Sequence, residues 1–189
     1  MEMDLPQACY RILEEISGVV DVSETSQTTE LIKTIRASKR VFVAGAGRSG
    51  LMMRAFAMRV MQLGIDTYVV GESTTPDVRK DDLLIIGSGS GRTGGPVSYA
   101  QIARNAGVPL AVITAAKDSP INEIANIIIR LPAPTPKVHE IGKVQASVQP
   151  MGTLFEQSLL VYLDAVIILL MIELNVPESA LYRRHTQLE

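Results

Sequence analysis

Apolar and polar residues alternate along this chain in blocks that predict helices and strands in regular succession. Apolar residues at helical spacing over about 5–20 and 24–37 predict two amphipathic helices at the start. The following blocks predict, in order, strand 40–44, helix 49–63, strand 67–70, strand 83–87, helix 95–106, strand 109–114, a short helix near 119–125, strand 127–131 and a long helix over 151–173.

The predicted strands are short aliphatic runs separated by helices or long crossovers. This order favours a parallel sheet with right-handed connections and helices on both faces. We therefore predict a single α/β domain, a three-layer α/β/α sandwich with a central parallel five-stranded sheet. The N-terminal helices 5–37 and the C-terminal helix 151–173 are expected to pack on this α/β core.

The stretch 132–150 interrupts the alternation of strands and helices. It contains Pro132, Pro134, Pro136 and Pro150 and is longer than a routine connection. Loops of this length are usually lids or mobile segments. The stretch is therefore a candidate cover for a site.

The last predicted helix contains the apolar run LLVYLDAVIILLMI, from Leu159 to Ile172. A membrane span needs about 20 apolar residues, and this run is shorter and is broken by Asp164. We therefore expect no membrane association. The run instead predicts a buried helix, packed partly in its own core and partly against another copy of the chain. Helix 49–63, with its four methionines, is expected to serve core and interface packing in the same way.

Composition agrees with an aliphatic α/β domain. The chain has 189 residues, of which 47% are hydrophobic but only 4% aromatic. Its net charge of −2 gives no electrostatic footprint for nucleic acid. Cys9 is the only cysteine, which excludes an internal disulfide and fits a reducing compartment. The acidic N-terminus does not have the layout of a signal peptide, so a cytoplasmic protein is expected.

Two glycine- and hydroxyl-rich turns directly follow apolar strands. GAGRSG (Gly45 to Gly50) follows the first predicted strand, and GSGSGRTGG (Gly87 to Gly95) follows the third. A strand that leads into such a turn and then a helix offers free backbone N–H groups and a positive helix end, which suit a phosphate. Two such turns in successive βα units predict a site for a phosphorylated small molecule.

The second turn also carries Ser88, Ser90 and Thr93, whose hydroxyls can supplement the backbone donors. The alternative is that these hydroxyls, and that of Ser49, only cap helix N-termini. Arg48 either polarises a substrate oxygen or is solvated at the rim. The candidate substrate-binding residues are Arg48, Ser49, Ser88, Gly89, Ser90, Gly91, Arg92 and Thr93.

A dinucleotide site is an alternative interpretation of the first turn. Gly45, Gly47 and Gly50 fit the pattern G-x-G-x-x-G, and Glu72 follows Gly50 by 22 residues, near the ribose-binding spacing. An NAD-binding oxidoreductase would leave the Ser-rich second turn unexplained. It would also leave no part of the chain for a separate catalytic domain.

Four motifs, VFVAGAGRSG, GSGSGRT, QPMGTLFEQSLL and the closing RRHTQLE, together resemble the sugar isomerase (SIS) domain family, and more narrowly its 6-phospho-3-hexuloisomerases. The resemblance implies an enzyme that interconverts D-arabino-hex-3-ulose 6-phosphate and fructose 6-phosphate through a 2,3-enediolate. That reaction belongs to the ribulose monophosphate pathway of formaldehyde fixation or detoxification. It requires neither a metal nor a redox cofactor. Arg92 departs from the family, which often has Glu or a small residue there.

The resemblance also implies roles for individual residues. Glu156, in the TLFEQ motif, is the expected catalytic base, although an acidic residue near a helix start can simply complement the dipole. His185 is the second expected catalytic residue, reaching the site of a neighbouring subunit to assist ring opening or proton transfer. The alternative for His185 is a frayed polar terminus. The other histidine, His139, is expected at the surface of the proline-rich stretch.

The implied partners are a phosphorylated ketohexose, further copies of the chain in a homotetramer and, in the pathway, 3-hexulose-6-phosphate synthase. Neither nucleic acid nor a membrane is an expected partner. Two alternative functions are compatible with the same two turns. The protein could be an isomerase of another sugar phosphate or a non-catalytic sugar-phosphate sensor. Such sensors usually add a DNA-binding head, and the residues before the first predicted strand show no basic recognition helix.

Overall fold

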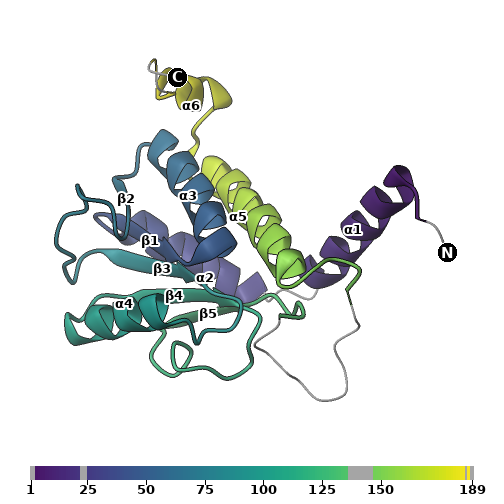
Figure 1. The fold of residues 1–189 in the computed structure, drawn as a ribbon. Helices are drawn as coiled ribbons and strands as arrows, with labels where there is room; N and C mark the ends of the chain where they lie inside the picture. The colour runs from purple at the N-terminus through teal and green to yellow at the C-terminus, as the bar shows by residue number, and fades with distance from the viewer. Residues whose placement is uncertain (1–2, 22–24, 136–146, 186, 188–189) are drawn as a thin grey trace.

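The chain folds into a central sheet covered by helices, in a computed structural model that describes residues 3–21, 25–135, 147–185 and 187 (Figure 1). The elements follow one another as α1 (Leu5–Val20), α2 (Thr25–Ala37), β1 (Val41–Gly45), α3 (Gly47–Gln62), β2 (Thr67–Val69), β3 (Leu83–Gly87), α4 (Gly94–Asn105), β4 (Leu110–Thr114), β5 (Ile127–Arg130), α5 (Thr153–Leu174) and α6 (Glu178–Arg183).

The sheet has five strands in the order β2-β1-β3-β4-β5, and every neighbouring pair is parallel. The chain builds outward from β1 to β2 and then returns to the other side of β1 with β3. The strand order therefore reverses between β1 and β3, whose carboxyl ends lie next to each other. In open parallel sheets, ligands bind at such a switch point.

Alternate strand residues enter two separate cores. In β3, Leu83 and Ile85 belong to the core formed with α2, α3, α5 and the end of α1, whereas Leu84 and Ile86 belong to the core formed with α4. Figure 1 shows α3 and α5 side by side on one side of the sheet and α4 on the other. The three-layer α/β/α sandwich predicted from the sequence is therefore confirmed.

Helix α5 is apolar on all sides and only partly covered. By length and composition it could cross a membrane, but its side chains Phe155, Leu159 and Leu170 are buried in the core of this fold. On its outer side Ile168 and Ile172 remain 59% and 70% exposed. Among the residues that the structure describes, none covers this outer surface of α5.

Helix α1 projects from the body at its N-terminal end (Figure 1). It begins in a capping box formed by Asp4 and Gln7 and is buried only near its end, at Ile16 and Val19. Leu5, Tyr10 and Leu13 are exposed on the projecting part. It therefore carries a second uncovered apolar surface.

The short helix predicted near 119–125 is wrong: residues 120–124 form turns. The contacts at the two ends of this segment explain the difference. Ser119 Oγ accepts a hydrogen bond from the Asn122 backbone N–H, and Asn122 Nδ2 donates to the carbonyls of Ala116 and Lys117. The Ser119 bond is of the kind that caps a helix N-terminus, but the chain has room for only one turn, because Asn126 exchanges hydrogen bonds with Leu110 of β4 and β5 starts at Ile127.

The opposite edge of the sheet, at the start of β1 and β3, is closed by an ion pair between Arg40 and Asp82. Arg40 Nη2 and Nε donate to the two carboxylate oxygens at 2.6 and 2.9 Å, and the Arg79 backbone N–H donates to the same carboxylate at 2.8 Å. Burial alone would raise the pKa of Asp82, but these hydrogen bonds and the positive charge of Arg40 outweigh it and lower the pKa.

We expect Asp82→Ala to lower the free energy of unfolding by about 3 kcal/mol near neutral pH, because the largely buried Arg40 guanidinium loses its partner. Urea unfolding of this variant and of the exposed neighbour Asp81→Ala measures the difference. Because folding lowers the pKa of Asp82, its contribution is present above the ordinary carboxyl pKa and disappears as pH falls through the lowered value. Equal losses in both variants, or a difference that persists in acid, would contradict this prediction.

Candidate active site

Three helices begin around one cleft at the carboxyl edge of the sheet. The cleft has a volume of about 480 Å³ and lies where α3, α4 and α5 start. The lining residues come from the turns after β1 and β3, from the chain after β5 and from the start of α5: Ala46, Arg48, Ser49, Gly89, Ser90, Thr93, Thr135, Pro150, Met151, Gly152, Thr153, Phe155 and Glu156. Both sequence turns thus meet at one site.

The N-cap positions of these helices are Ala46, Thr93 and Gly152, and none of them makes a side-chain capping hydrogen bond. The first N–H groups of a helix have no partner within the helix. Each helix also has a positive dipole end at its N-terminus. The cleft therefore offers backbone donors and positive potential from three directions, which suits an anion with several oxygen atoms.

The turn after β3 presents part of its residues to the cleft and uses the rest to hold its own shape. Gly89, Ser90 and Thr93 line the cleft. Ser88 does not: it is buried, and its Oγ accepts a hydrogen bond from the Gly91 N–H at 3.2 Å. The predicted phosphate residues therefore divide into a group that faces the cleft and a group that supports the turn.

Two glycines in this turn are required by close contacts. Gly91 has φ +59°, and a Cβ there would lie 2.1 Å from Ser119 Oγ. A Cβ on Gly89 would lie 3.0 Å from Phe155 Cδ1. A side chain at either position would move the turn or the start of α5, so both glycines allow the backbone to approach its neighbours.

The side chain of Arg92 is directed away from the cleft. Its Nη2 donates to the carbonyl of Asp118 at 3.0 Å, and the residue is exposed and absent from the cleft lining. Its backbone N–H donates to Ser90 Oγ at 3.3 Å. Arg92 thus supports the turn through its backbone N–H, and its charged group does not line the cleft.

A carboxylate and a guanidinium lie together in the cleft. Arg48 Nε and Glu156 Oε2 are 3.0 Å apart, with Arg48 on the first turn of α3 and Glu156 on the first turn of α5. The Glu156 side chain is 18% exposed and that of Arg48 is 53% exposed. Ser49, which is buried, lines the cleft beside them. The pair provides a proton acceptor and a cation that can stabilise a negatively charged oxygen.

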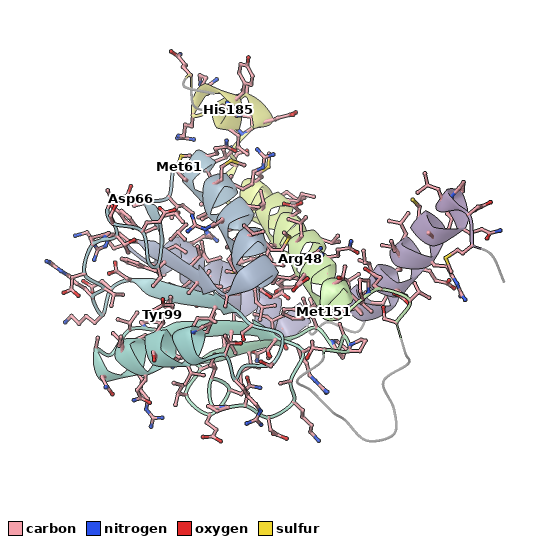
Figure 2. All side chains as sticks on the ribbon, viewed as in Figure 1. Arg48, Met61, Asp66, Tyr99, Met151 and His185 are labelled. Carbon is pink, nitrogen blue, oxygen red and sulfur yellow. The ribbon has the colours of Figure 1, made fainter. Side chains whose placement is uncertain are left out.

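His185 lies far from this cleft within one chain. It follows α6, where Arg184 Nη1 donates to the carbonyl of Gln62 at the end of α3. Figure 2 shows His185 near Met61 and at the opposite end of α3 from Arg48. A helix of 16 residues is about 24 Å long. His185 can therefore act in a cleft only if that cleft belongs to another subunit, and its catalytic role stays a prediction.

Several cleft residues are missing from the sequence prediction. Thr135, after β5, lies against Gly89 and Phe155, and its buried Oγ1 has no hydrogen-bond partner in the described part of the chain. Met151, labelled in Figure 2, is 81% exposed at the cleft. Thr135 belongs to the proline-rich stretch 132–150, which was the available signal, and Met151 directly follows that stretch. His139 and the centre of that stretch lie outside the described residues.

Neither a metal centre nor a ribose-binding acid is evident in the described residues. No group of three or more His, Cys, Asp or Glu side chains within them could hold a metal ion. Glu72, the candidate ribose ligand of the dinucleotide interpretation, forms an ion pair with Arg54 of α3. Gly45 and Gly50 serve a close approach between β1 and α3, because a Cβ on Gly45 would lie 2.9 Å from the Gly50 backbone.

The comparisons with known proteins agree on one family. The SIS domain model matches residues 34–159. A 3-hexulose-6-phosphate isomerase of Bacillus subtilis is 39% identical over 178 residues, covering 94% of this chain and 95% of the relative. A protein of the same name from Methanocaldococcus jannaschii is 42% identical over 158 residues, covering 84% and 82%.

A solved structure from Methanococcus jannaschii gives the same result. This hypothetical protein, for which the crystal structure inferred a molecular function of 3-hexulose-6-phosphate isomerase, superimposes with a TM-score of 0.80. It is 38% identical, and the match covers 96% of each chain. The similarity thus extends beyond the turns to the whole fold.

We expect Ser90→Ala to weaken the binding of inorganic phosphate by about 1.5–3 kcal/mol, roughly 10- to 150-fold, because a hydroxyl that contacts an anion is lost. Ser88→Ala should also weaken binding, because the turn loses the hydrogen bond to the Gly91 N–H. Isothermal titration calorimetry with phosphate measures both, and Ser98→Ala, on the exposed side of α4, is the control. Unchanged affinity in the first two variants would place the phosphate elsewhere.

Proposed function

The chain belongs to the SIS domain family, and we propose that it is an isomerase interconverting D-arabino-hex-3-ulose 6-phosphate and fructose 6-phosphate. Relatives named 3-hexulose-6-phosphate isomerase, from bacteria and archaea, support this substrate. The observation that carries the proposal is the cleft itself, where three helix N-termini suited to a phosphate surround the carboxylate of Glu156.

The reaction moves one proton between neighbouring carbons. A base removes the proton from C2 of the 3-ketose, which gives a 2,3-enediolate, and a proton is then delivered to C3. One carboxylate within reach of both carbons can do both steps. We assign this role to Glu156. The conversion is redox-neutral overall, so the proposed mechanism uses neither a metal nor a nicotinamide cofactor.

The remaining cleft residues have distinct tasks in this mechanism. Ser90, Thr93 and the backbone N–H groups of their turn bind the phosphate, and Ser49 adds a hydroxyl from the first turn of α3. We assign the stabilisation of the enediolate oxygens to Arg48, whose Nε lies 3.0 Å from Glu156 Oε2. Binding the phosphate away from the reacting carbons orients them against the base.

We further propose that the active enzyme is a homotetramer. Leu5 on α1, Leu51 on α3 and Ile172 on α5 are 77%, 57% and 70% exposed, and they lie on three helices with uncovered apolar side chains. Monomers rarely leave large apolar patches in water, so self-association along these helices would cover them. Such an assembly would also give His185 a cleft to enter.

We place the enzyme in the cytoplasm, next to 3-hexulose-6-phosphate synthase in the ribulose monophosphate pathway. The single cysteine, Cys9, is a free thiol, which fits a reducing compartment. The main competing proposal is an isomerase of another sugar phosphate, because the phosphate-binding turns do not identify the sugar.

A panel of hexulose, pentulose and aldose phosphates, followed by NMR in heavy water, tests the proposed substrate. Conversion of the hex-3-ulose phosphate to fructose 6-phosphate, faster than any other interconversion in the panel, is the expected result. If a pentose or aldose phosphate is converted faster, the proposed substrate is wrong, but the protein is still a sugar-phosphate isomerase. No isomerisation of any member would remove the enzymatic proposal.

We expect Glu156→Gln to reduce turnover by roughly 10²- to 10⁴-fold while the sugar phosphate still binds, because the amide keeps the shape of the side chain but cannot accept the proton. Steady-state rates and calorimetric binding measure the two effects. Glu173→Gln is the matched control on the same helix, where the carboxylate only pairs with Arg36 at the surface. Retention of more than about a tenth of wild-type turnover would be incompatible with a base at this position.

If His185 acts in a neighbouring cleft, two inactive variants should complement each other. A hybrid of Glu156→Gln and His185→Gln chains contains sites in which Glu156 comes from one chain and His185 from the other. Coexpression with two affinity tags isolates the hybrids, and light scattering reports their size. We expect the hybrids to regain activity. If His185→Gln is poorly active and the hybrids show no gain in activity, His185 acts only within its own chain. Normal activity of His185→Gln would exclude His185 from catalysis.

A further inference from the structure

One side chain of α1, Glu15, holds the segment that leads into the cleft wall. Ser147 Oγ donates to Glu15 Oε2 at 2.7 Å, the Val148 backbone N–H to Oε1 at 2.8 Å, and Gln149 Nε2 to Oε2 at 2.8 Å. A single carboxylate thus accepts hydrogen bonds from three consecutive residues that are 132–134 positions away in the chain. Charge-assisted bonds of this kind are stronger than neutral ones.

The ionised form of Glu15 is the one that suits these donors. Burial alone would raise the pKa of the carboxyl, but the hydrogen bonds from Ser147, Gln149 and Val148 outweigh it and lower the pKa. The adjacent Glu14 is exposed, and among the described residues its side chain forms only an ion pair with Arg11, at 3.7 Å. The two neighbouring glutamates of α1 therefore differ in whether they contact the rest of the molecule.

The residues that follow the held segment form the cleft wall and the start of α5. Pro150, Met151 and Gly152 line the cleft, and Met151 has φ +55°, in the left-handed region that a residue with a Cβ disfavours. Such a backbone persists only where the flanking structure holds it. On its far side the Thr153 N–H donates to the Pro150 carbonyl at 3.1 Å. On its near side, the Glu15 hydrogen bonds hold residues 147–149.

We propose that Glu15 is a positioning residue of the active site. By fixing residues 147–149, it holds the left-handed turn at Met151 and the first turn of α5, and with them the carboxylate of Glu156. Glu15 is absent from the cleft lining and acts only through this segment. The expected effect of Glu15 on catalysis rests on the proposed function, whereas its expected effect on the position of residues 147–155 does not.

The position of the Glu15 contacts makes the expected effect selective. Residues 147–149 lead into the wall that carries Glu156, whereas the phosphate turn follows β3 and is held by its own hydrogen bonds, including Gly91 N–H to Ser88 Oγ. Loss of the Glu15 contacts should therefore misplace the base and leave the phosphate end in place. A small misplacement of a reacting group is costly in rate.

Glu15→Gln tests the proposal, with Glu14→Gln as the matched control. An amide side chain has one acceptor oxygen and adds two donors, so it cannot accept all three hydrogen bonds. We expect kcat to fall roughly 10-fold in Glu15→Gln, with an unchanged inhibition constant for inorganic phosphate. Hydrogen exchange followed by mass spectrometry should be faster in peptides that cover 147–155 and unchanged in peptides from β3. Glu14→Gln should match the wild type in every measurement.

A second variant, Ser147→Ala, checks that the effect passes through the same contacts. Ser147 Oγ also accepts a hydrogen bond from the Gln149 N–H at 3.0 Å. If Ser147 acts mainly by binding Glu15, the loss of kcat in the double variant should be clearly smaller than the sum of the two single losses, which is non-additive behaviour. Fully additive losses of kcat would overturn the proposed route from Glu15 to the cleft.

The remaining outcomes separate positioning from simple stabilisation. Wild-type kcat in Glu15→Gln would overturn the proposal, and so would faster exchange throughout the core, since that would indicate a general loss of stability. If the wild-type protein isomerises no sugar phosphate, the proposed function is wrong. In that case the exchange experiment alone decides: faster exchange confined to 147–155 supports the positioning role, and unchanged exchange there overturns it.

Discussion

The reversal of strand order between β1 and β3 is the constraint on which the rest of the site depends. Right-handed crossovers send α3 to one face of the sheet and α4 to the other, so the two helices diverge from neighbouring strand ends. A gap remains between their N-termini, with backbone donors on both sides. Helix α5 closes the third side, and its first turn brings Glu156 to within 3.0 Å of Arg48.

Local sequence patterns predicted most of the fold because most elements obey a single periodicity. The helix predicted over 5–20 and the strand predicted over 83–87 match α1 and β3. Errors occur where a distant contact or the backbone conformation overrides the pattern. The predicted helix near 119–125 is cut to turns because Asn126 is bonded to Leu110 of β4, and α5 starts at Thr153 and not at 151 because Met151 is left-handed. Helix α6 was missed because its few residues carry no clear apolar period.

The candidate site was predictable where a turn sequence carries the chemistry, and not where distant segments meet. Ser90 and Thr93 line the cleft as expected, since their turn directly follows a strand at the switch point. The side chain of Arg92 does not, because its guanidinium reaches the carbonyl of Asp118. Glu15 could not be identified from the sequence, because its three donors lie more than a hundred residues away and no local pattern records the contact.

The proposed division of the cleft into a phosphate end and a base end also bears on substrate choice. In a hex-3-ulose 6-phosphate, C3 and C2 stand three and four carbons from the carbon that bears the phosphate. In a pentose 5-phosphate isomerised between C2 and C1, the reacting carbons stand at the same separations. The phosphate turn and Glu156 are therefore equally placed for both sugars. The difference is the extra C1 hydroxymethyl group of the hexulose, which extends beyond the reacting carbons. On the proposed assignment of the two ends, selectivity between these sugars would come from the wall beside Glu156, which includes Met151 and Gly152.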